Sequence, residues 1–148
     1  MGSATEMTHS EALRCITWHA AAAAAQAAVA RAEGLGVRVN VALVDVSGVL
    51  AGFLRMPGAP LHSVEIAIDK AYTAAGFGLP TARWTEVLQS HSPAVRQGLV
   101  QRPRFVAFGG GLPIVEGGQC IGAIGVSGGS EQQDEEIARA GLAALGLD

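Results

Sequence analysis

Four polar residues near the middle of the chain could hold an acidic ligand or move a proton. Arg55 and Lys70 could each bind a carboxylate through charge-assisted hydrogen bonds. Asp69 and Tyr72 flank Lys70 and supply a carboxylate and a phenol, which could act as base and acid in a proton transfer. The sequence therefore predicts ligand binding by Arg55 and Lys70, and catalytic roles for Asp69, Lys70 and Tyr72.

Each of these residues also has a structural alternative. Arg55 could end a strand and pair with a nearby acid. Lys70 could lie on the surface or pair with Glu65 or Asp69. Asp69 could brace a turn, and Tyr72 could be a core residue with a bonded hydroxyl.

A glycine-rich segment near the C-terminus could bind an anion. Ser127 and Gly128 precede a predicted helix, and free amides at a helix N-terminus attract negative charge. Three acids that follow, Glu131, Asp134 and Glu135, would repel such an anion. The segment is therefore predicted either to bind a ligand through Ser127 and Gly128, or only to form a tight turn between a strand and a helix.

The composition predicts a small protein that binds neither nucleic acid nor a membrane. The 148 residues suit a single domain, 1–148. The net charge of −3 gives no basic surface for phosphate backbones, and no run reaches the roughly 18 apolar residues of a membrane span. Charged residues make up 16% of the chain, against about 25% in average soluble proteins, so we expect part of the surface to be covered in a homo-oligomer.

The cysteines and the N-terminus predict a cytoplasmic location. Cys15 and Cys120 occur in no metal or haem attachment motif, and we expect both to be buried thiols in a reducing compartment. The polar N-terminal residues do not resemble a signal peptide.

Hydrophobic spacing predicts helices and a hairpin in the first two thirds of the chain. Thr8 and Glu11 form a capping-box pattern that predicts the start of the first helix, which Gly34 and Gly36 end. A hairpin follows, with its turn at residues 45–48. Its predicted strands are 37–46 and 49–55, and the predicted helices after it are 61–76, 81–90 and 93–99, the last as a turn or a helix.

The last third is predicted to return to strands and end in a helix. The predicted strands are 104–108, 112–116 and 119–126. Gly117 and Gly118 suit the turn of a second hairpin, and Ser130 with Gln133 forms a capping box that begins the last helix. Because hairpins dominate, we expect an α+β fold with a largely antiparallel, five-stranded sheet flanked by helices.

Four ordered blocks of sequence stand out along the chain. They are the first hairpin (41–48 and 55–60), a helical segment (68–74), a glycine-rich loop (108–114), and a strand with the entry to the last helix (121–129 and 133–134). Together they resemble the GlcG/HbpS-like family, which includes the C-terminal domain of PduO, and the resemblance covers roughly residues 10–146.

The resemblance implies a fold and a range of functions. The implied layout is profilin-like or PAS-like, and the implied assemblies are homo-oligomers, often tetramers or octamers. Members include haem-binding proteins, GlcG, and lyases that act on aromatic hydroxylamines such as 4-hydroxylaminobenzoate. Because these activities differ, the resemblance predicts the fold more firmly than the function.

His19 is the candidate metal ligand that the resemblance suggests. Family members carry a haem-associated histidine on the first helix, and haem iron accepts an imidazole nitrogen as an axial ligand. His19 lies on the matching helix beside Trp18 and Ala20, where a flat macrocycle could approach. The alternative is a half-buried histidine at a helix edge or a subunit contact.

Three hypotheses about function follow. The first is a protein that binds haem or a similar planar small molecule through His19. The second is a cofactor-free lyase or isomerase, in which Arg55 or Lys70 holds the acid group of a small aromatic or carboxylated metabolite and Asp69 or Tyr72 moves protons. The third is a scaffold subunit without activity of its own.

Overall fold

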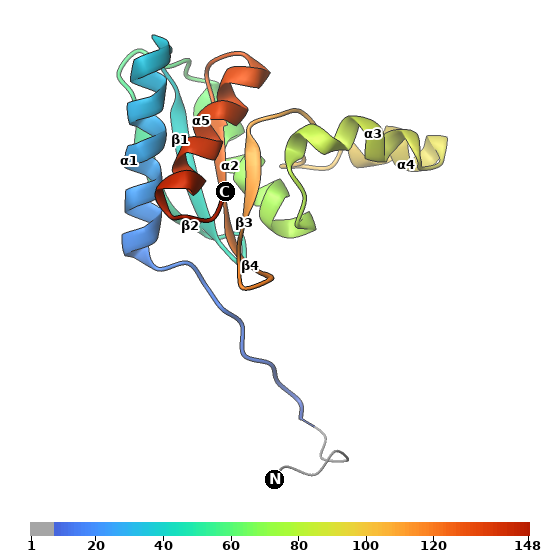
Figure 1. Ribbon diagram of the computed structural model, residues 1–148. Coiled ribbons are helices and arrows are strands. Elements are labelled where there is room, and N and C mark those ends of the chain that lie inside the picture. Colours follow the sequence, from blue (N-terminus) through green and yellow to red (C-terminus); the bar gives the residue numbers. More distant parts are fainter. Residues whose placement is uncertain (1–7) are drawn as a thin grey trace.

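The computed structural model describes residues 8–148 and has an antiparallel sheet at its centre (Figure 1). The sheet has four strands in the order β2-β1-β4-β3. The strands are β1 (Asn40–Asp45), β2 (Leu50–Arg55), β3 (Gly111–Glu116) and β4 (Gln119–Ser127). Helices α1 and α5 cover one face, and α2 covers the other (Figure 1).

One face of the sheet packs against α1 (Trp18–Leu35) and α5 (Glu131–Ala144). The alternate residues Val41 and Leu43 of β1 point to this face and join buried alanines of α1 in the larger core cluster. Strand alternation sends Ala42 and Val44 to the opposite face. The fold therefore has three layers, with the sheet in the middle.

Small residues let α2 (Ser63–Phe77) lie close to the other face of the sheet. Ala67 and Ala71 are fully buried against it. A Cβ atom on Gly125 of β4 would lie 2.0 Å from the carbonyl oxygen of Ala67, so only glycine fits there. This close packing determines where the other side chains of α2 lie.

Three short helical segments lead away from α2 and extend to one side of the sheet (Figure 1). They are a 3-10 helix, η1 (Thr81–Arg83), followed by α3 (Trp84–Gln89) and α4 (Pro93–Leu99). The rings of Phe77, Trp84 and Phe105 pack edge to face where this extension leaves the body. No residue of α4 is buried.

The predicted strand at residues 104–108 is wrong, and the sheet has four strands rather than five. Arg104 has a φ of 67°, which no strand residue adopts. The amide of Val106 donates to Oγ1 of Thr73 on α2 instead of to a neighbouring strand. A side chain of the packed helix thus takes the hydrogen bond that a strand partner would need.

The predicted start of the first helix is also wrong. Thr17, not Thr8, caps α1, since its Oγ1 atom accepts from the amide of Ala20 at 3.1 Å. The backbone amide of Ile16 donates to the carbonyl of Ile121 on β4, which keeps the preceding segment out of a helix. That segment leaves Cys15 exposed, contrary to the expectation of two buried thiols.

Candidate functional site

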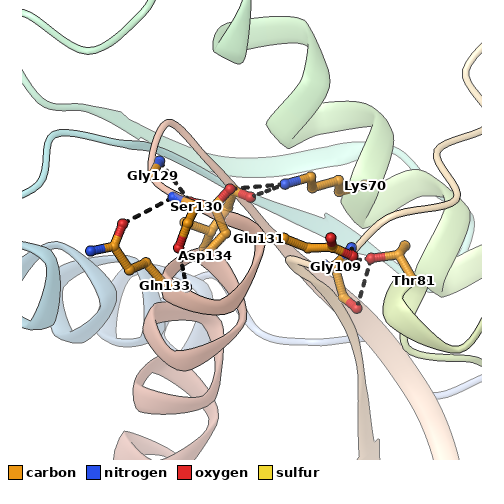
Figure 2. A network of polar contacts seen from close by, with 10 residues as sticks. Lys70, Thr81, Gly109, Gly129, Ser130, Glu131, Gln133 and Asp134 are labelled. Carbon is orange, nitrogen blue, oxygen red and sulfur yellow. Dashed lines mark hydrogen bonds and ion pairs between the residues drawn. The ribbon is translucent and has the colours of Figure 1, made fainter.

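Lys70 of α2 and Asp134 of α5 form an ion pair in the protein interior (Figure 2). The Nζ atom of Lys70 lies 3.1 Å from Oδ2 of Asp134, and the two side chains are 1% and 4% exposed. The same ammonium donates to the carbonyl of Val126 at 2.8 Å and lies 5.1 Å from the ring centroid of Phe108. Lys70 is therefore enclosed by the fold, and its ammonium group is committed to partners within the chain.

The glycine-rich loop before β3 covers this ion pair. A Cβ atom on Gly110 would lie 2.6 Å from Nζ of Lys70, so any larger residue would collide with the lysine. Glu131 of α5 accepts from the amide of Gly109 at 2.7 Å, and Thr81 accepts from the amide of Gly111 at 2.8 Å (Figure 2). The loop thus joins α5 and η1 around the buried charges.

Burial sets the protonation behaviour of the pair. It lowers the pKa of Lys70 and raises the pKa of Asp134, because the charged form of each group loses its hydration. The mutual attraction of the two charges, and the amides of Gly129 and Gly128 that face Asp134, oppose these shifts only in part.

A second polar cluster lies on the outer side of α2. Nε of Arg104 donates to Oδ1 of Asp69 at 3.0 Å. The guanidinium carbon of the same arginine lies 3.6 Å from the ring centroid of Tyr72, the geometry of a cation–π contact. Arg104 is therefore held on two sides, and Asp69 and Tyr72 come together around it.

The backbone of Arg104 is strained. Its φ of 67° lies in the left-handed region, and within residues 8–148 it is the one non-glycine residue with a positive φ. Oγ1 of Thr73 donates to the carbonyl of Arg104 at 3.0 Å and fixes this conformation. Strain of this kind costs on the order of 1–3 kcal/mol and is concentrated at functional sites.

An open groove lies beside Arg104, and we call it the Arg104 groove. It is bounded by α2, by the turn between β1 and β2, and by residues 99–105, and its volume is about 380 Å³. Tyr72 and Phe77 of α2 line one side, while Arg102, Arg104 and Phe105 line another. A site of this kind can hold a small molecule.

His19 lies on the first turn of α1, a helix that packs on the face of the sheet opposite to α2. Its imidazole stacks on the indole of Trp18, with the ring centroids 3.6 Å apart. Both side chains are exposed. His19 can therefore reach an external ligand, with Trp18 as a flat apolar neighbour.

Arg55 lies at the end of the edge strand β2, where its Nη1 atom donates to Oδ1 of Asn40 at 3.3 Å. It lines a groove of about 490 Å³ near the C-terminal end of α1. Val29 of α1 lines the same groove, and the helix rise places Val29 roughly 15 Å along the axis from His19. Arg55 and His19 therefore occupy different surfaces.

Ser127 ends β4, and Gly128 begins the short segment that enters α5. The amide of Gly129 donates to Oδ1 of Asp134 at 2.9 Å, and the amide of Ser130 donates to Oε1 of Gln133 at 2.9 Å. The protein's own side chains therefore accept the amides of Gly129 and Ser130, and ligand binding by Ser127 and Gly128 stays a prediction.

The structure thus separates the residues that the enzyme hypothesis would combine. Asp69 and Tyr72 meet on the outer side of α2, Lys70 points into the interior, and Arg55 ends a strand on the sheet edge. Within the described part of the chain, no three His, Cys, Asp or Glu residues are grouped to hold a metal ion. Among residues 8–148, no helix combines the length and apolar character that crossing a membrane requires.

Two residues that the sequence did not single out as partners, Asp134 and Arg104, organise the two clusters. For Asp134, helical spacing does indicate a buried position. Asp134 lies three and four residues before the buried Ile137 and Ala138, so the helix turns its carboxylate toward the core. No local signal marks Arg104, because its role depends on the contact between residues 104–106 and α2.

Comparison with known proteins gives consistent matches. The family model described as haem degrading protein HbpS-like matches residues 16–143. An uncharacterized 15.0 kDa protein from the dhaT-dhaS intergenic region of Citrobacter freundii is 38% identical over 136 residues, which cover 92% of this chain and 96% of that protein.

Solved structures agree with these matches. The Klebsiella pneumoniae protein ORFY has a TM-score of 0.89 at 32% identity, with 97% of this chain and 99% of that chain covered. The complex of PduOC with haem has a TM-score of 0.83 at 35% identity, with 90% and 97% covered. HbpS has a TM-score of 0.78 at 36% identity, with 98% of both chains covered. The chain therefore belongs to the HbpS-like family, as its sequence blocks predicted.

Proposed function

We propose that this protein binds haem, with His19 as an axial ligand of the iron. The observation that carries the proposal is the exposed, stacked pair of Trp18 and His19 on the first turn of α1. The haem complex of the similar protein PduOC supports the choice of ligand. Haem would supply an iron that accepts an imidazole nitrogen.

The residues around His19 fit a flat, largely apolar ligand. Trp18 is 69% exposed, and its indole offers an apolar face for a macrocycle. Leu13, five residues earlier in the chain, is exposed as well. The residues that follow His19 on α1 are alanines, whose side chains are small.

A second copy of the chain would complete this site. A macrocycle lying on the exposed Trp18 and His19 would keep its other face in water, and covering that face needs a further surface. Edge strand β2 exposes Leu50 and Leu54, and unpaired edges with apolar side chains favour association. We therefore include a homo-oligomer, a tetramer or an octamer, in the proposal.

Absorption spectroscopy tests the proposal directly. Titration with hemin should give a saturable, sharpened Soret band, and His19→Ala should weaken the binding. His91→Ala is the matched control, because His91 is an exposed histidine on the short segment between α3 and α4. Binding that does not saturate, or binding that His19→Ala and His91→Ala affect equally, would overturn the assignment.

Tryptophan fluorescence gives a second, local readout. The described chain has one exposed tryptophan, Trp18, and one buried tryptophan, Trp84. In a Trp84→Phe variant, haem bound beside His19 should quench the remaining emission in proportion to occupancy. Size-exclusion chromatography with light scattering should show an oligomer. A monomer that still binds haem with full affinity would refute the proposal that a second copy of the chain completes the site.

A further inference from the structure

We propose that the Arg104 groove binds a small aromatic carboxylate, at a site separate from the haem site. Three independent features of the groove support this ligand class: aromatic walls, an uncommitted guanidinium group, and a second guanidinium that is held in place before any ligand arrives.

The walls of the groove favour a flat, apolar body. The rings of Tyr72 and Phe77 on α2 are partly exposed, and they line the groove together with Phe105 from the segment after α4. Phe105 is fixed by edge-to-face contact with Phe77, whose ring centroid is 5.9 Å away, and with buried Trp84, at 4.9 Å. An aromatic ligand would add a further ring to a rigid cluster.

The charges of the groove favour one carboxylate. Arg102 is exposed and makes no ion pair with another residue in the range 8–148. Arg104 uses Nε to reach Asp69, and its terminal nitrogen atoms make no hydrogen bond to another described residue. Guanidinium groups match the two oxygens of a carboxylate, and this pairing is much stronger than its neutral equivalent. The carboxylate of Asp69 nearby would disfavour a ligand with several negative charges.

The position of Arg104 is determined before binding. Asp69, the ring of Tyr72 and the bond from Thr73 hold its side chain and its backbone. The ring of Tyr72 also lies close to the turn between β1 and β2, where a Cβ atom on Gly48 would lie 3.0 Å from it. A ligand would therefore meet an ordered cation and would not have to order it, which favours affinity.

Fluorine NMR with 4-fluorobenzoate tests this site, and 4-fluorobenzamide is the uncharged counterpart. We expect saturable binding of the carboxylate and at least tenfold weaker binding of the amide. Arg102→Gln and Arg104→Gly should each weaken the carboxylate about tenfold or more. Arg83→Gln should leave it unchanged, since Arg83 is an exposed arginine paired with Glu86 outside the groove.

Arg104→Gly separates binding from folding, because glycine adopts a positive φ without strain. Equal affinity for the amide and the carboxylate, or unchanged affinity in both groove variants, would overturn the proposal. Hemin titrations keep the two sites distinguishable: His19→Ala should retain 4-fluorobenzoate binding, and Arg102→Gln should retain haem binding. If hemin displaces 4-fluorobenzoate stoichiometrically, the groove is part of the haem site and the separate site is refuted.

Discussion

Nζ of Lys70 and Oδ2 of Asp134 lie 3.1 Å apart between α2 and α5, where almost no water reaches either group. The pair connects helices on opposite faces of the sheet, past the end of β4. Buried ion pairs often contribute little net stability, because desolvation offsets their attraction, but removing one partner leaves a charge without compensation. The pair therefore contributes mainly to the relative placement of α2 and α5, and little to the net stability of the fold.

A double-mutant cycle should reveal this property. Lys70→Met and Asp134→Asn should each lower the free energy of unfolding, Lys70→Met by roughly 3–5 kcal/mol, because an unpaired charge remains buried. The double variant should lose clearly less than the sum of the two. Urea denaturation measures all three values, and strictly additive losses would contradict the coupling.

The matched control for this cycle is the exposed pair of Arg31 and Glu136. It joins α1 and α5 at 2.7 Å, with both side chains about half exposed. Arg31→Met should lower the free energy of unfolding by about 1 kcal/mol or less, because water screens the pair.

The raised pKa of Asp134 predicts a dependence of stability on pH. The ordinary value is 3.8, and burial raises it in the folded state. Above pH 3.8 the unfolded chain loses this proton while the folded chain still holds it, so stability falls as pH rises until the raised pKa is passed. The free energy of unfolding of the wild type, minus that of Asp134→Asn, should therefore decrease as pH rises from about 4. A difference that increases over this range would refute the direction of the shift.

Packing of α2 on the sheet predicts opposite effects of two glycine-to-alanine changes. Gly125→Ala should strongly destabilise the fold or prevent folding, because its Cβ would lie 2.0 Å from the carbonyl oxygen of Ala67. Gly34→Ala, in α1, meets no atom within 4 Å and should stabilise the fold by about 0.5–1 kcal/mol through helix propensity. Thermal denaturation of both variants compares them, and a tolerated Gly125→Ala would mean that α2 is not held close to the sheet.

The hydroxyl of Thr73 holds the segment at 104–106, and removing it should destabilise the fold. Its Oγ1 atom accepts from the amide of Val106 at 3.1 Å and donates to the carbonyl of Arg104. Thr73→Val keeps the shape but leaves both backbone groups without this partner, so the free energy of unfolding should fall by roughly 1–3 kcal/mol. Thr85→Val, at an exposed position of α3, should change it much less. Faster amide exchange at Val106 in Thr73→Val would confirm the cause, and unchanged exchange would contradict it.

Local signals were sufficient to predict most of the elements. Turn residues predicted both hairpins at their observed positions. The first turn lies at Asp45–Gly48. The second lies at Gly117 and Gly118, and both of these glycines have a positive φ. The capping box of Ser130 and Gln133 begins α5 as expected. These patterns worked because their hydrogen bonds are made within a few residues.

The errors occur where a distant residue takes over a hydrogen bond. The residues 104–108 have strand-forming side chains, yet Thr73 accepts the amide of Val106 and no strand forms. Similarly, the sequence near Lys70 offers Glu65 and Asp69 as partners, but the actual partner, Asp134, is 64 residues away. Single-sequence patterns contain little information on such contacts.

The three-layer arrangement has a consequence for thermodynamic linkage. The proposed haem ligand His19 lies on α1 and the Arg104 groove lies beside α2, and these two helices pack on opposite faces of the sheet. A coupling free energy between the two sites would require a rearrangement of the sheet that separates the two helices. The two sites should therefore fill independently, so the heat released on adding both ligands together equals the sum of the two separate heats.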